Sequence, residues 1–495
     1  MGINGGTVEG VWVFHRHGDR TPTRPLASRS ADSRRRNSES DFWNSVIPSG
    51  RPCPVYASLS SRYPPDVHTS NGAEFLDAAR DPYGFLTYRG MDQMRDAGRR
   101  CAVRYNRIGH QSEIRGPDPP RRVVGGKGGD GSSGWCIGFG NDLSEYWDIE
   151  ASSTNYLRTV KSAQCFLDGL VGTGKEGGRD YWDAFADRAA ASDGEGGRGD
   201  DRAGPSVRVR DREGDTLNAF DRDPDLMRDL VSDVVSGDEF ARVDGAASPL
   251  AALLAGSLPG LAEDRGRHAF PSPSGINWIH AADHFVCRGS HGVPYTAFSG
   301  AGGDELDPSS AAAAARAEQV LAALRGPTLS HLAWRFRMWY RSPPLLAAVA
   351  APPLREVEGG VRDALTLDQG DKRPFAVHSC HDVTILSLLY GVRASFLMDD
   401  EDKAGGGDGG MNFWPPYAST LIFELVRTRP RHMMSNDGGD PDDTHAVRIL
   451  LNGAPVFMRS LSDGGGETMA VLRPSEFFRL ISDLEERGGW GEGGG

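Results

Sequence analysis

The sequence predicts an α/β protein whose central sheet is interrupted by a long, mostly helical insertion. Five apolar runs of strand length alternate with helical patterns along the chain, at Val8–Phe14, Tyr146–Ala151, Phe375–Ser379, Thr420–Val426 and Ala446–Leu451. The first three runs end in polar residues that are suited to bind a ligand. A chain of 495 residues is long enough to bury a large core as one large or two modest domains.

The insertion divides the sheet-forming part of the chain in two. We place the first part of the core in residues 1–172, the helical insertion in residues 173–350 and the second part of the core in residues 351–495. Residues 23–142 are expected to add loops and short helices beside the site. Helical spacing within the insertion is clearest at Asp225–Val235, Ser309–Leu324 and Leu329–Tyr340.

The first motif follows directly on the first predicted strand and reads Arg16-His17-Gly18-Asp19-Arg20-Thr21-Pro22. Ligands of open α/β sheets bind just outside the carboxyl ends of the strands. Arginine presents a planar fork of donors that matches phosphate oxygens, so two arginines beside one imidazole indicate phosphate chemistry. Gly18 allows a close turn, and Pro22 stiffens the exit of the loop. The alternative is a basic surface turn that contains a histidine by chance.

A second motif, His381-Asp382, stands between the predicted strand Phe375–Ser379 and an apolar helical run from Val383 to Tyr390. This order puts both side chains at a sheet edge and at the positive N-terminus of a helix. Alone, such a pair is often a helix cap or a metal ligand. Together with the first motif it supplies a proton donor for the leaving oxygen of a phosphoester.

A third element contributes an arginine. The strand Tyr146–Ala151 is followed by Ser152–Asn155, which we expect to cap a helix, and Arg158 falls in the first turn of that helix. An arginine near a helix N-terminus opposes the helix dipole, which favours a role facing an anion over a structural one. A solvent-exposed arginine is the alternative.

Composition narrows the classes of partner. A net charge of −13 and an isoelectric point near 5.5 argue against a nucleic-acid partner, for which a basic face would be expected. No apolar run is long enough to span a bilayer, and no signal peptide precedes the first motif. We therefore expect a cytoplasmic protein for the sequence as given, with reduced cysteines, and a secreted or organellar one if the N-terminus is truncated.

Taken together, the heptad Arg16–Pro22, the stretch Ser153–Leu170 and the pair His381-Asp382 resemble the histidine acid phosphatases, branch two of the histidine phosphatase superfamily. The segment Trp414–Ser419, leading into the strand at Thr420, is similar to the segment that follows the His-Asp pair in those enzymes. The resemblance implies a Rossmann-like three-layer α/β/α core, with the helical insertion as a cap over the active site. Within the family the chain is most similar to the lysophosphatidic acid phosphatases, which implies a lysophospholipid substrate. The segments that support this are Ser153–Asn155, Leu86-Thr87 with Gly90–Met94, and Ala282–His284.

The resemblance also implies a role for each motif residue. His17 would be the nucleophile that becomes phosphohistidine, and Asp382 the general acid that protonates the leaving alkoxide. Arg16, Arg20 and Arg158 would clamp the phosphoryl oxygens, and His381 would be a further donor. The partner is then a small phosphate monoester, and no cofactor or metal is required, because preorganised cations can stabilise the charge of the transferred phosphoryl group.

The same cluster predicts a response to pH. Three guanidinium groups around His17 disfavour its imidazolium form, so His17 can stay neutral below the ordinary histidine pKa of about 6.5. Asp382 has to carry a proton to act as the acid. Both requirements favour an acidic optimum, at roughly pH 4 to 6 from reference pKa values.

Several alternatives stay open at this point. A phytase or a broad-specificity acid phosphatase would use the same chemistry. An HD-type metal phosphohydrolase would need more histidine and aspartate ligands for its metal. Mutases also occur in the superfamily, and a catalytically silent chain would bind phosphate without hydrolysing an ester. The aromatic cluster Trp334–Tyr340 is interpreted as core of the cap rather than an acyl-chain pocket. His280, Asp283 and His284 have helical metal-ligand spacing, but we interpret them as ordinary cap residues.

Overall fold

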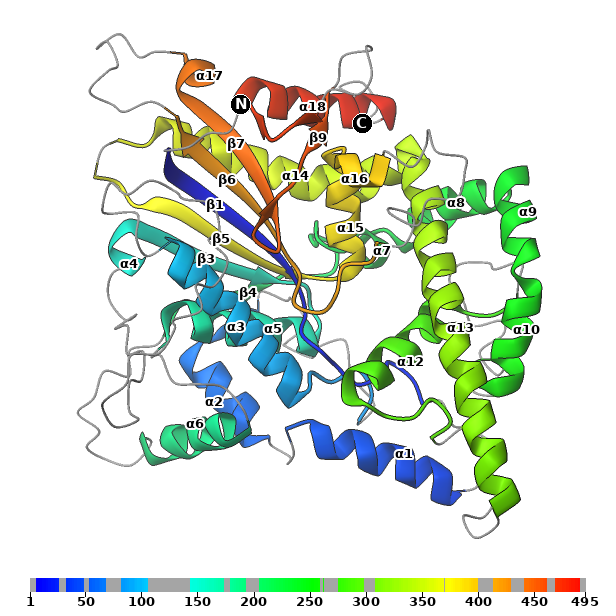
Figure 1. The fold of residues 1–495 in the computed structure, drawn as a ribbon. Helices are drawn as coiled ribbons and strands as arrows, with labels where there is room; N and C mark the ends of the chain where they lie inside the picture. The colour runs from blue at the N-terminus through cyan, green and yellow to red at the C-terminus, as the bar shows by residue number, and fades with distance from the viewer. Residues whose placement is uncertain are drawn as a thin grey trace, which may run out of the picture.

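A nine-stranded mixed sheet forms the centre of the molecule (Figure 1). The computed structural model describes residues 6–25, 33–48, 53–67, 82–105, 143–172, 179–192, 204–258, 261, 275–297, 308–368, 370–398, 413–428, 440–460 and 468–489. Its strands lie in the order β11-β7-β6-β1-β5-β3-β4-β2, with β8 beside β7. β1, β5, β3, β4 and β2 run parallel, whereas β6 is antiparallel to β1, and β7 to β6. The strands are β1 Thr7–Arg16, β2 Pro65–Val67, β3 Trp147–Ser153, β4 Val207–Val209, β5 Arg373–Cys380, β6 Thr420–Arg427, β7 His445–Leu451, β8 Ala454–Pro455, β11 Val471–Leu472 and, in a separate pair, β9 Met458–Arg459 with β10 Thr468–Met469.

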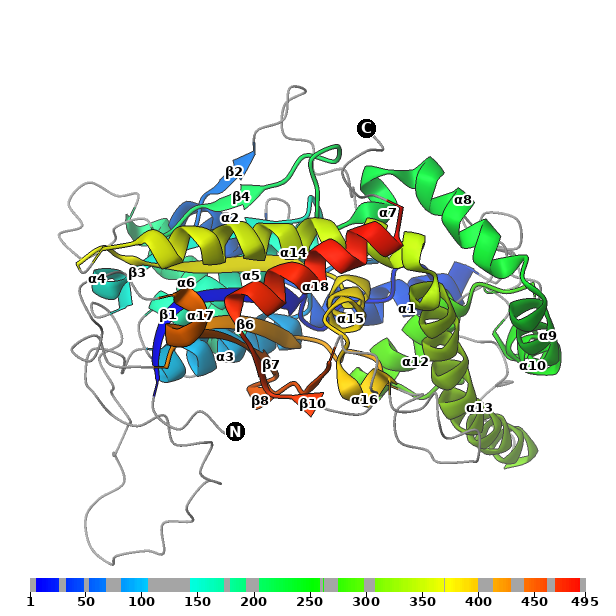
Figure 2. The same ribbon diagram turned by 90° about the horizontal axis from the view of Figure 1, so that it is seen from above.

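Helices cover both faces of this sheet, as the alternation along β1 requires. Successive strand side chains point to opposite faces. Val11 and Val13 belong to the apolar cluster that contains residues of α3 and α5, whereas Trp12 and Phe14 belong to the cluster with α14, α15 and α18 (Figure 2). The predicted three-layer α/β/α core is therefore confirmed. These layer helices, with the smaller ones beside them, are α1 Ser33–Val46, α2 Pro54–Arg62, α3 Tyr88–Tyr105, α4 Leu143–Tyr146, α5 Leu157–Val171, α6 Arg179–Ser192, α14 Pro343–Thr366, α15 Asp382–Gly391, α16 Ser395–Met398, α17 Pro441–Thr444 and α18 Pro474–Arg487.

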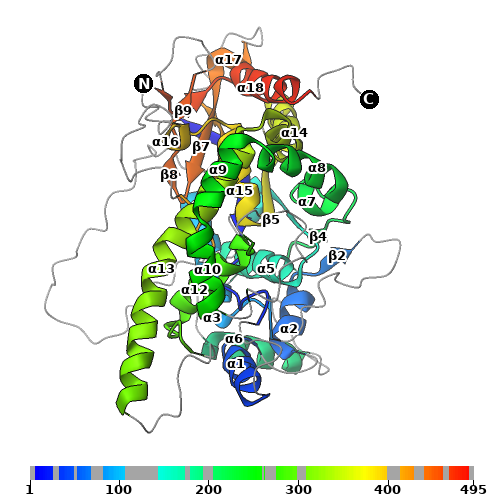
Figure 3. The ribbon, with the colours of Figure 1, turned by 90° about the vertical axis from the view of Figure 1, so that its right-hand side faces the viewer.

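A second, helical body lies beside the edge of the sheet at which β1, β3 and β5 end (Figures 1 and 3). Its aromatic residues Phe336, Trp339 and Tyr340 are buried, so the interpretation of that cluster as core is confirmed. Because β4 pairs with β3 and β2, the range 173–350 also contributes one strand to the main sheet. The helices of this body are α7 Ala219–Arg222, α8 Pro224–Val235, α9 Asp238–Ala246, α10 Ser248–Ser257, α12 Trp278–His291 and α13 Pro308–Arg341.

Helix α13 corrects one sequence expectation, because the two helices predicted at Ser309–Leu324 and Leu329–Tyr340 are one. Pro327 lies inside it and cannot donate a backbone hydrogen bond. The Thr328 hydroxyl donates to the Leu324 carbonyl at 2.7 Å, which supplies a bond within the turn that the proline disturbs. The helix therefore continues through Pro327, whereas the sequence predicted a break there.

Helix α3 corrects another expectation, since residues 23–142 were predicted to hold only loops and short helices. It has 18 residues and lies against α5 within the core. The two helices can approach closely because residue 98 of α3 is glycine. A Cβ at this position would lie 2.0 Å from the Phe166 carbonyl oxygen of α5, so any other residue would push the helices apart. In the described ranges, no helix is both long and apolar enough to cross a membrane.

Candidate active site

The three predicted site segments meet because their strands are neighbours. β1 pairs in parallel with β5, where Arg16 stands opposite Cys380, and β5 pairs with β3, where Ser379 stands opposite Ser153. The loops after these strands leave the same edge of the sheet side by side and face the helical body (Figure 1). Residues that are hundreds of positions apart thus converge at the carboxyl ends of parallel strands, where α/β proteins bind ligands.

His17 is held with one ring nitrogen aimed at the backbone and the other left open. The side chain is buried, and its Nδ1 lies 2.8 Å from the Gly18 carbonyl oxygen. A carbonyl can only accept, so Nδ1 carries the proton and the neutral ring has its lone pair on Nε2. That Nε2 makes no hydrogen bond within the described part of the chain. The Nε2 lone pair is therefore available to a ligand.

The loop after His17 is fixed by its packing against α3 and α5. A Cβ at Gly18 would lie 2.2 Å from the Gly90 carbonyl oxygen, so the backbones touch only because residue 18 is glycine. The Gly18 amide donates to the Ser162 hydroxyl at 3.2 Å, and the Asp19 amide donates to Gln93 at 2.9 Å. These contacts with α3 and α5 fix the loop and therefore the position of the His17 imidazole.

Arg16 links the first motif to the second. One of its terminal nitrogens donates to the Pro415 carbonyl at 2.6 Å, and the other lies 2.7 Å from an Asp382 carboxylate oxygen. The guanidinium carbon lies 4.3 Å from the centre of the Tyr417 ring. The arginine is therefore held on three sides, as a rigid phosphate donor should be.

Arg20 is held by a residue of the helical body. Its two terminal nitrogens reach the two Asp283 carboxylate oxygens, at 3.0 and 2.8 Å, and Asp283 also accepts from the Thr23 amide at 2.9 Å. Burial raises the pKa of Asp283, but the charge of Arg20 and its hydrogen bond outweigh this and hold that pKa far below its ordinary value. Sequence reasoning assigned Asp283 no role at the site, since nothing local links it to Arg20.

Arg158 and His381 complete the ring around His17. Arg158 is the second residue of α5, and its guanidinium lies 4.4 Å from the centre of the Tyr156 ring. The His381 ring lies 5.6 Å from the His17 ring, and its Nε2 is 3.4 Å from the Thr154 hydroxyl. The expected cap of α5 is wrong, because Ser152 and Ser153 complete β3 and the N-cap residue is Tyr156, which makes no side-chain cap bond.

Asp382 begins α15, at the position that the sequence predicts for it. Its side chain is 19% exposed, which leaves it in reach of a substrate. One carboxylate oxygen accepts from the Val383 amide at 2.9 Å and the other from the Trp414 indole at 3.0 Å. The carboxylate is thereby held against Arg16. We call the predicted phosphate-binding group of Arg16, His17, Arg20, Arg158 and His381 the phosphate cluster.

The electrostatics of the cluster keep both histidines neutral. Burial lowers the pKa of His17 well below its ordinary value, and the charges of Arg158, Arg20 and Arg16 lower it further. The same causes, in the same order, lower the pKa of His381. The guanidinium effect predicted from the sequence is thus present, but burial, which the sequence does not display, is the larger cause.

Two further contacts at the site were not foreseen. The Asp19 carboxylate, fully buried, accepts from the Thr87 hydroxyl and lies 2.6 Å from Nε2 of His291, the last residue of α12. The Tyr417 hydroxyl lies 3.3 Å from the Cys287 sulfur, also on α12. Asp283, Cys287 and His291 follow a helical spacing on one face, which is the signal that could have identified α12 as the helix above the site.

The site is built of cations rather than of metal ligands. In the ranges described above, no group of three or more His, Cys, Asp or Glu side chains is arranged to hold a metal ion. The five described cysteines are free thiols, and Cys165 and Cys380 are fully buried, as expected of small core residues; Cys136 lies outside the described residues.

Comparison with known families gives a match in the first part of the chain. Residues 7–195, which contain His17 and Arg158, match the family model of the histidine phosphatase superfamily, branch 2. The match covers less than half of the chain and includes the first and third motifs of the site. Together with the geometry of the site, it supports a phosphoric monoester hydrolase.

Similar solved structures are phosphatases of inositol phosphates. The Hafnia alvei phytase in complex with tartrate is 13% identical, with 97% of each chain covered and a TM-score of 0.45. The Bifidobacterium longum multiple inositol polyphosphate phosphatase in complex with inositol hexasulfate is 13% identical, with 97% of this chain and 92% of that one covered and a TM-score of 0.46. At these scores the likeness carries no argument about substrate. No curated protein matches the chain significantly.

Proposed function

We propose that the protein hydrolyses phosphate monoesters through a phosphohistidine on His17, with Asp382 as the proton donor. The observation that supports this most is the open Nε2 of a neutral, buried His17 inside a ring of three arginines. Arg16, Arg20 and Arg158 would bind the phosphoryl oxygens and stabilise the charge that spreads over them during transfer. Because these cations occupy the place that a metal would take, we propose that the reaction needs none.

In the first step Nε2 of His17 attacks phosphorus and the ester P–O bond breaks. The proton of the Asp382 carboxyl passes to the leaving alkoxide, which departs as an alcohol. Binding prepares this step, because the phosphoryl oxygens compete for the Arg16 nitrogen that the free enzyme gives to Asp382 at 2.7 Å. Arg16 then serves the phosphate, and Asp382 is free to turn its proton toward the leaving oxygen.

In the second step water attacks the phosphorus of phosphohistidine and the P–N bond breaks. The Asp382 carboxylate takes a proton from the water, which restores the acid, and inorganic phosphate leaves. His381, which is also kept neutral, would donate to a phosphoryl oxygen throughout. Each proton is therefore accounted for by residues within the cluster.

The test is hydrolysis of p-nitrophenyl phosphate with a chelator present, from about pH 3 to pH 9, for the parent chain and for His17→Ala. We expect chelator-resistant activity with an acidic optimum that His17→Ala abolishes. Loss of activity with chelator, or activity that survives His17→Ala, would overturn the mechanism. A parent chain that binds phosphate but never turns over would be a silent phosphate-binding module.

For the substrate, we propose lysophosphatidic acid as the first candidate. The support is the resemblance to lysophosphatidic acid phosphatase type 6 of three short segments: Ser153–Asn155, Leu86-Thr87 with Gly90–Met94, and Ala282–His284. A phytase or broad-specificity acid phosphatase is the alternative. Comparing kcat/KM for lysophosphatidate, inositol hexakisphosphate and glycerol phosphate separates the three.

A further inference from the structure

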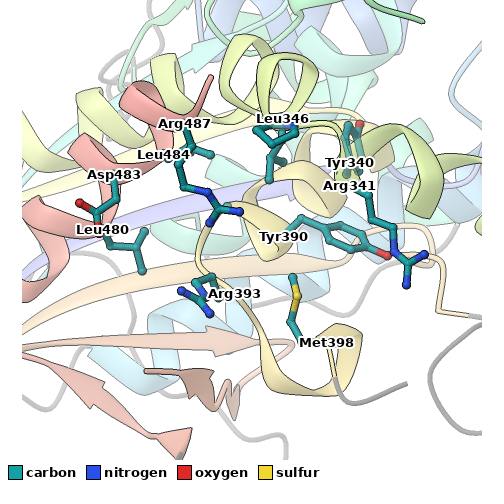
Figure 4. A pocket seen from close by; sticks show the side chains of 12 residues that line it. Tyr340, Arg341, Leu346, Tyr390, Arg393, Met398, Leu480, Asp483, Leu484 and Arg487 are labelled. Atoms are coloured by element: carbon teal, nitrogen blue, oxygen red, sulfur yellow. The ribbon is translucent and has the colours of Figure 1, made fainter. Parts of the chain in front are cut away.

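A pocket of about 210 Å³ lies between α14, α15 and α18 (Figure 4). None of the residues implicated in phosphate binding lines it. Part of its wall is apolar and comes from Leu346 of α14 and from Leu480 and Leu484 of α18, with Met398 across from them. The pocket thus has an apolar surface that the catalytic site does not use.

The same pocket is rich in positive charge. Arg341, Arg393 and Arg487 line it, and the single acidic residue among its lining residues is Asp483. The guanidinium groups of Arg393 and Arg487 make no hydrogen bond or ion pair within the described part of the chain. Burial lowers the pKa of Arg393, and the charges of Arg487 and Arg459 lower it further. The charge of Asp483 acts in the opposite direction and raises it. The pocket lining therefore holds three guanidinium groups against one carboxylate.

The backbone conformation of Arg393 also indicates that this arginine has a role at the pocket. Arg393 has φ +58°, in the left-handed region, just after α15 ends. Glycine or asparagine usually occupies this position after a helix, because other side chains are strained there. A cation near a helix C-terminus gains something from the helix dipole, which also applies to Arg487 at the end of α18. The dipole does not explain why both arginines face one apolar pocket.

We propose that this pocket binds a small amphipathic anion. Arg393 and Arg487 would hold an anionic head group such as a carboxylate, and Leu346, Leu480 and Leu484 would cover a short apolar tail. Typical pockets for drug-sized ligands measure roughly 300–1,000 Å³, so the ligand here is smaller than those. The proposal is independent of the reaction proposed for His17.

The test is calorimetric titration of the full chain with octanoate, at a saturating concentration of inorganic phosphate so that the phosphate cluster is occupied. Losing one charge-assisted contact should weaken octanoate binding about tenfold or more in Arg393→Gly and in Arg487→Gln. Arg393→Gly should fold at least as well as the parent, because glycine suits the positive φ. Arg479→Gln is the matched control, since Arg479 is exposed on the same α18 and does not line the pocket.

Two further probes separate the head group from the tail. Acetate lacks the apolar tail and octylamine lacks the negative charge, so both should bind at least tenfold more weakly than octanoate. Octanoate that fails to bind the parent chain would overturn the proposal. Equal binding to the parent, Arg393→Gly and Arg487→Gln would overturn it as well, because the arginines would then serve only their helix ends.

Discussion

Replacing Asp283 with asparagine tests whether helix α12 sets the position of Arg20 in the phosphate clamp. The pair is bidentate, at 3.0 and 2.8 Å, and the side chains are 9% and 7% exposed. Removing one partner of a buried ion pair costs about 3–5 kcal/mol, and we expect the lower end because asparagine keeps one acceptor. Loss of one well-placed donor to a charged transition state lowers kcat by about 100-fold, so we expect a fall in kcat/KM of that order.

A second buried pair in the same helical body provides the control. Asp244 of α9 pairs with Arg335 and with His331, both of α13, and the Asp244 and Arg335 side chains are 0% and 5% exposed. Asp244→Asn should lower the free energy of unfolding by a similar amount and leave kcat/KM of the folded enzyme unchanged. The assay is calorimetric unfolding together with p-nitrophenyl phosphate kinetics below the unfolding temperature. Equal kcat/KM for the two variants would refute the positioning role of Asp283.

Three other changes test separate parts of the structure. In Asp382→Asn, hydrolysis of glycerol phosphate should fall far more than that of p-nitrophenyl phosphate, whose leaving group needs no proton; equal losses in a steady-state comparison would contradict the role as acid. Gly18→Ala should fold poorly and be inactive, as measured by expression, circular dichroism and turnover, because its Cβ would meet the Gly90 carbonyl at 2.2 Å. Burial lowers the pKa of His15 to about 4 and the pKa of His284 and His378 to about 3, so below pH 6.5 the unfolded chain binds more protons than the folded one. The free energy of unfolding should therefore fall as the pH drops from 6.5 toward 4, by about 1.4 kcal/mol per pH unit for each histidine. Urea unfolding at several pH values measures this.

The parts of the fold that the sequence displayed were those with local periodicity. The runs that became β1, β5, β6 and β7 are continuous apolar strands, and α5 and α15 begin where their helical patterns begin. β2 and β4 have three residues each, too few for a pattern to emerge. β4 is a strand because it pairs with β3, and β2 is a strand because it pairs with β4. α13 was split at Pro327 because a proline signal is local, whereas the packing that keeps the helix continuous is not.

In the candidate site, too, the residues that could be predicted from the sequence are those marked by a local motif. His17 and Asp382 could be found because each stands next to a strand in a short, specific motif. Asp283 could not, since it meets Arg20 across 263 residues of sequence and its role depends on how the helical body sits over the sheet. Only one of the two causes of the lowered His17 pKa could be predicted from the sequence. The neighbouring arginine charges follow from the motifs, whereas burial depends on the folded structure.

The most direct test of the central claim is to trap the covalent intermediate. The enzyme is mixed with ³²P-labelled p-nitrophenyl phosphate, quenched in alkali within milliseconds and digested, and the labelled peptide is identified by mass spectrometry. We predict an acid-labile, alkali-stable phosphate on the peptide that contains His17, present in the parent chain, accumulating in Asp382→Asn and absent in His17→Ala. A label on another residue, or turnover with no labelled protein at any quench time, would contradict the phosphohistidine mechanism.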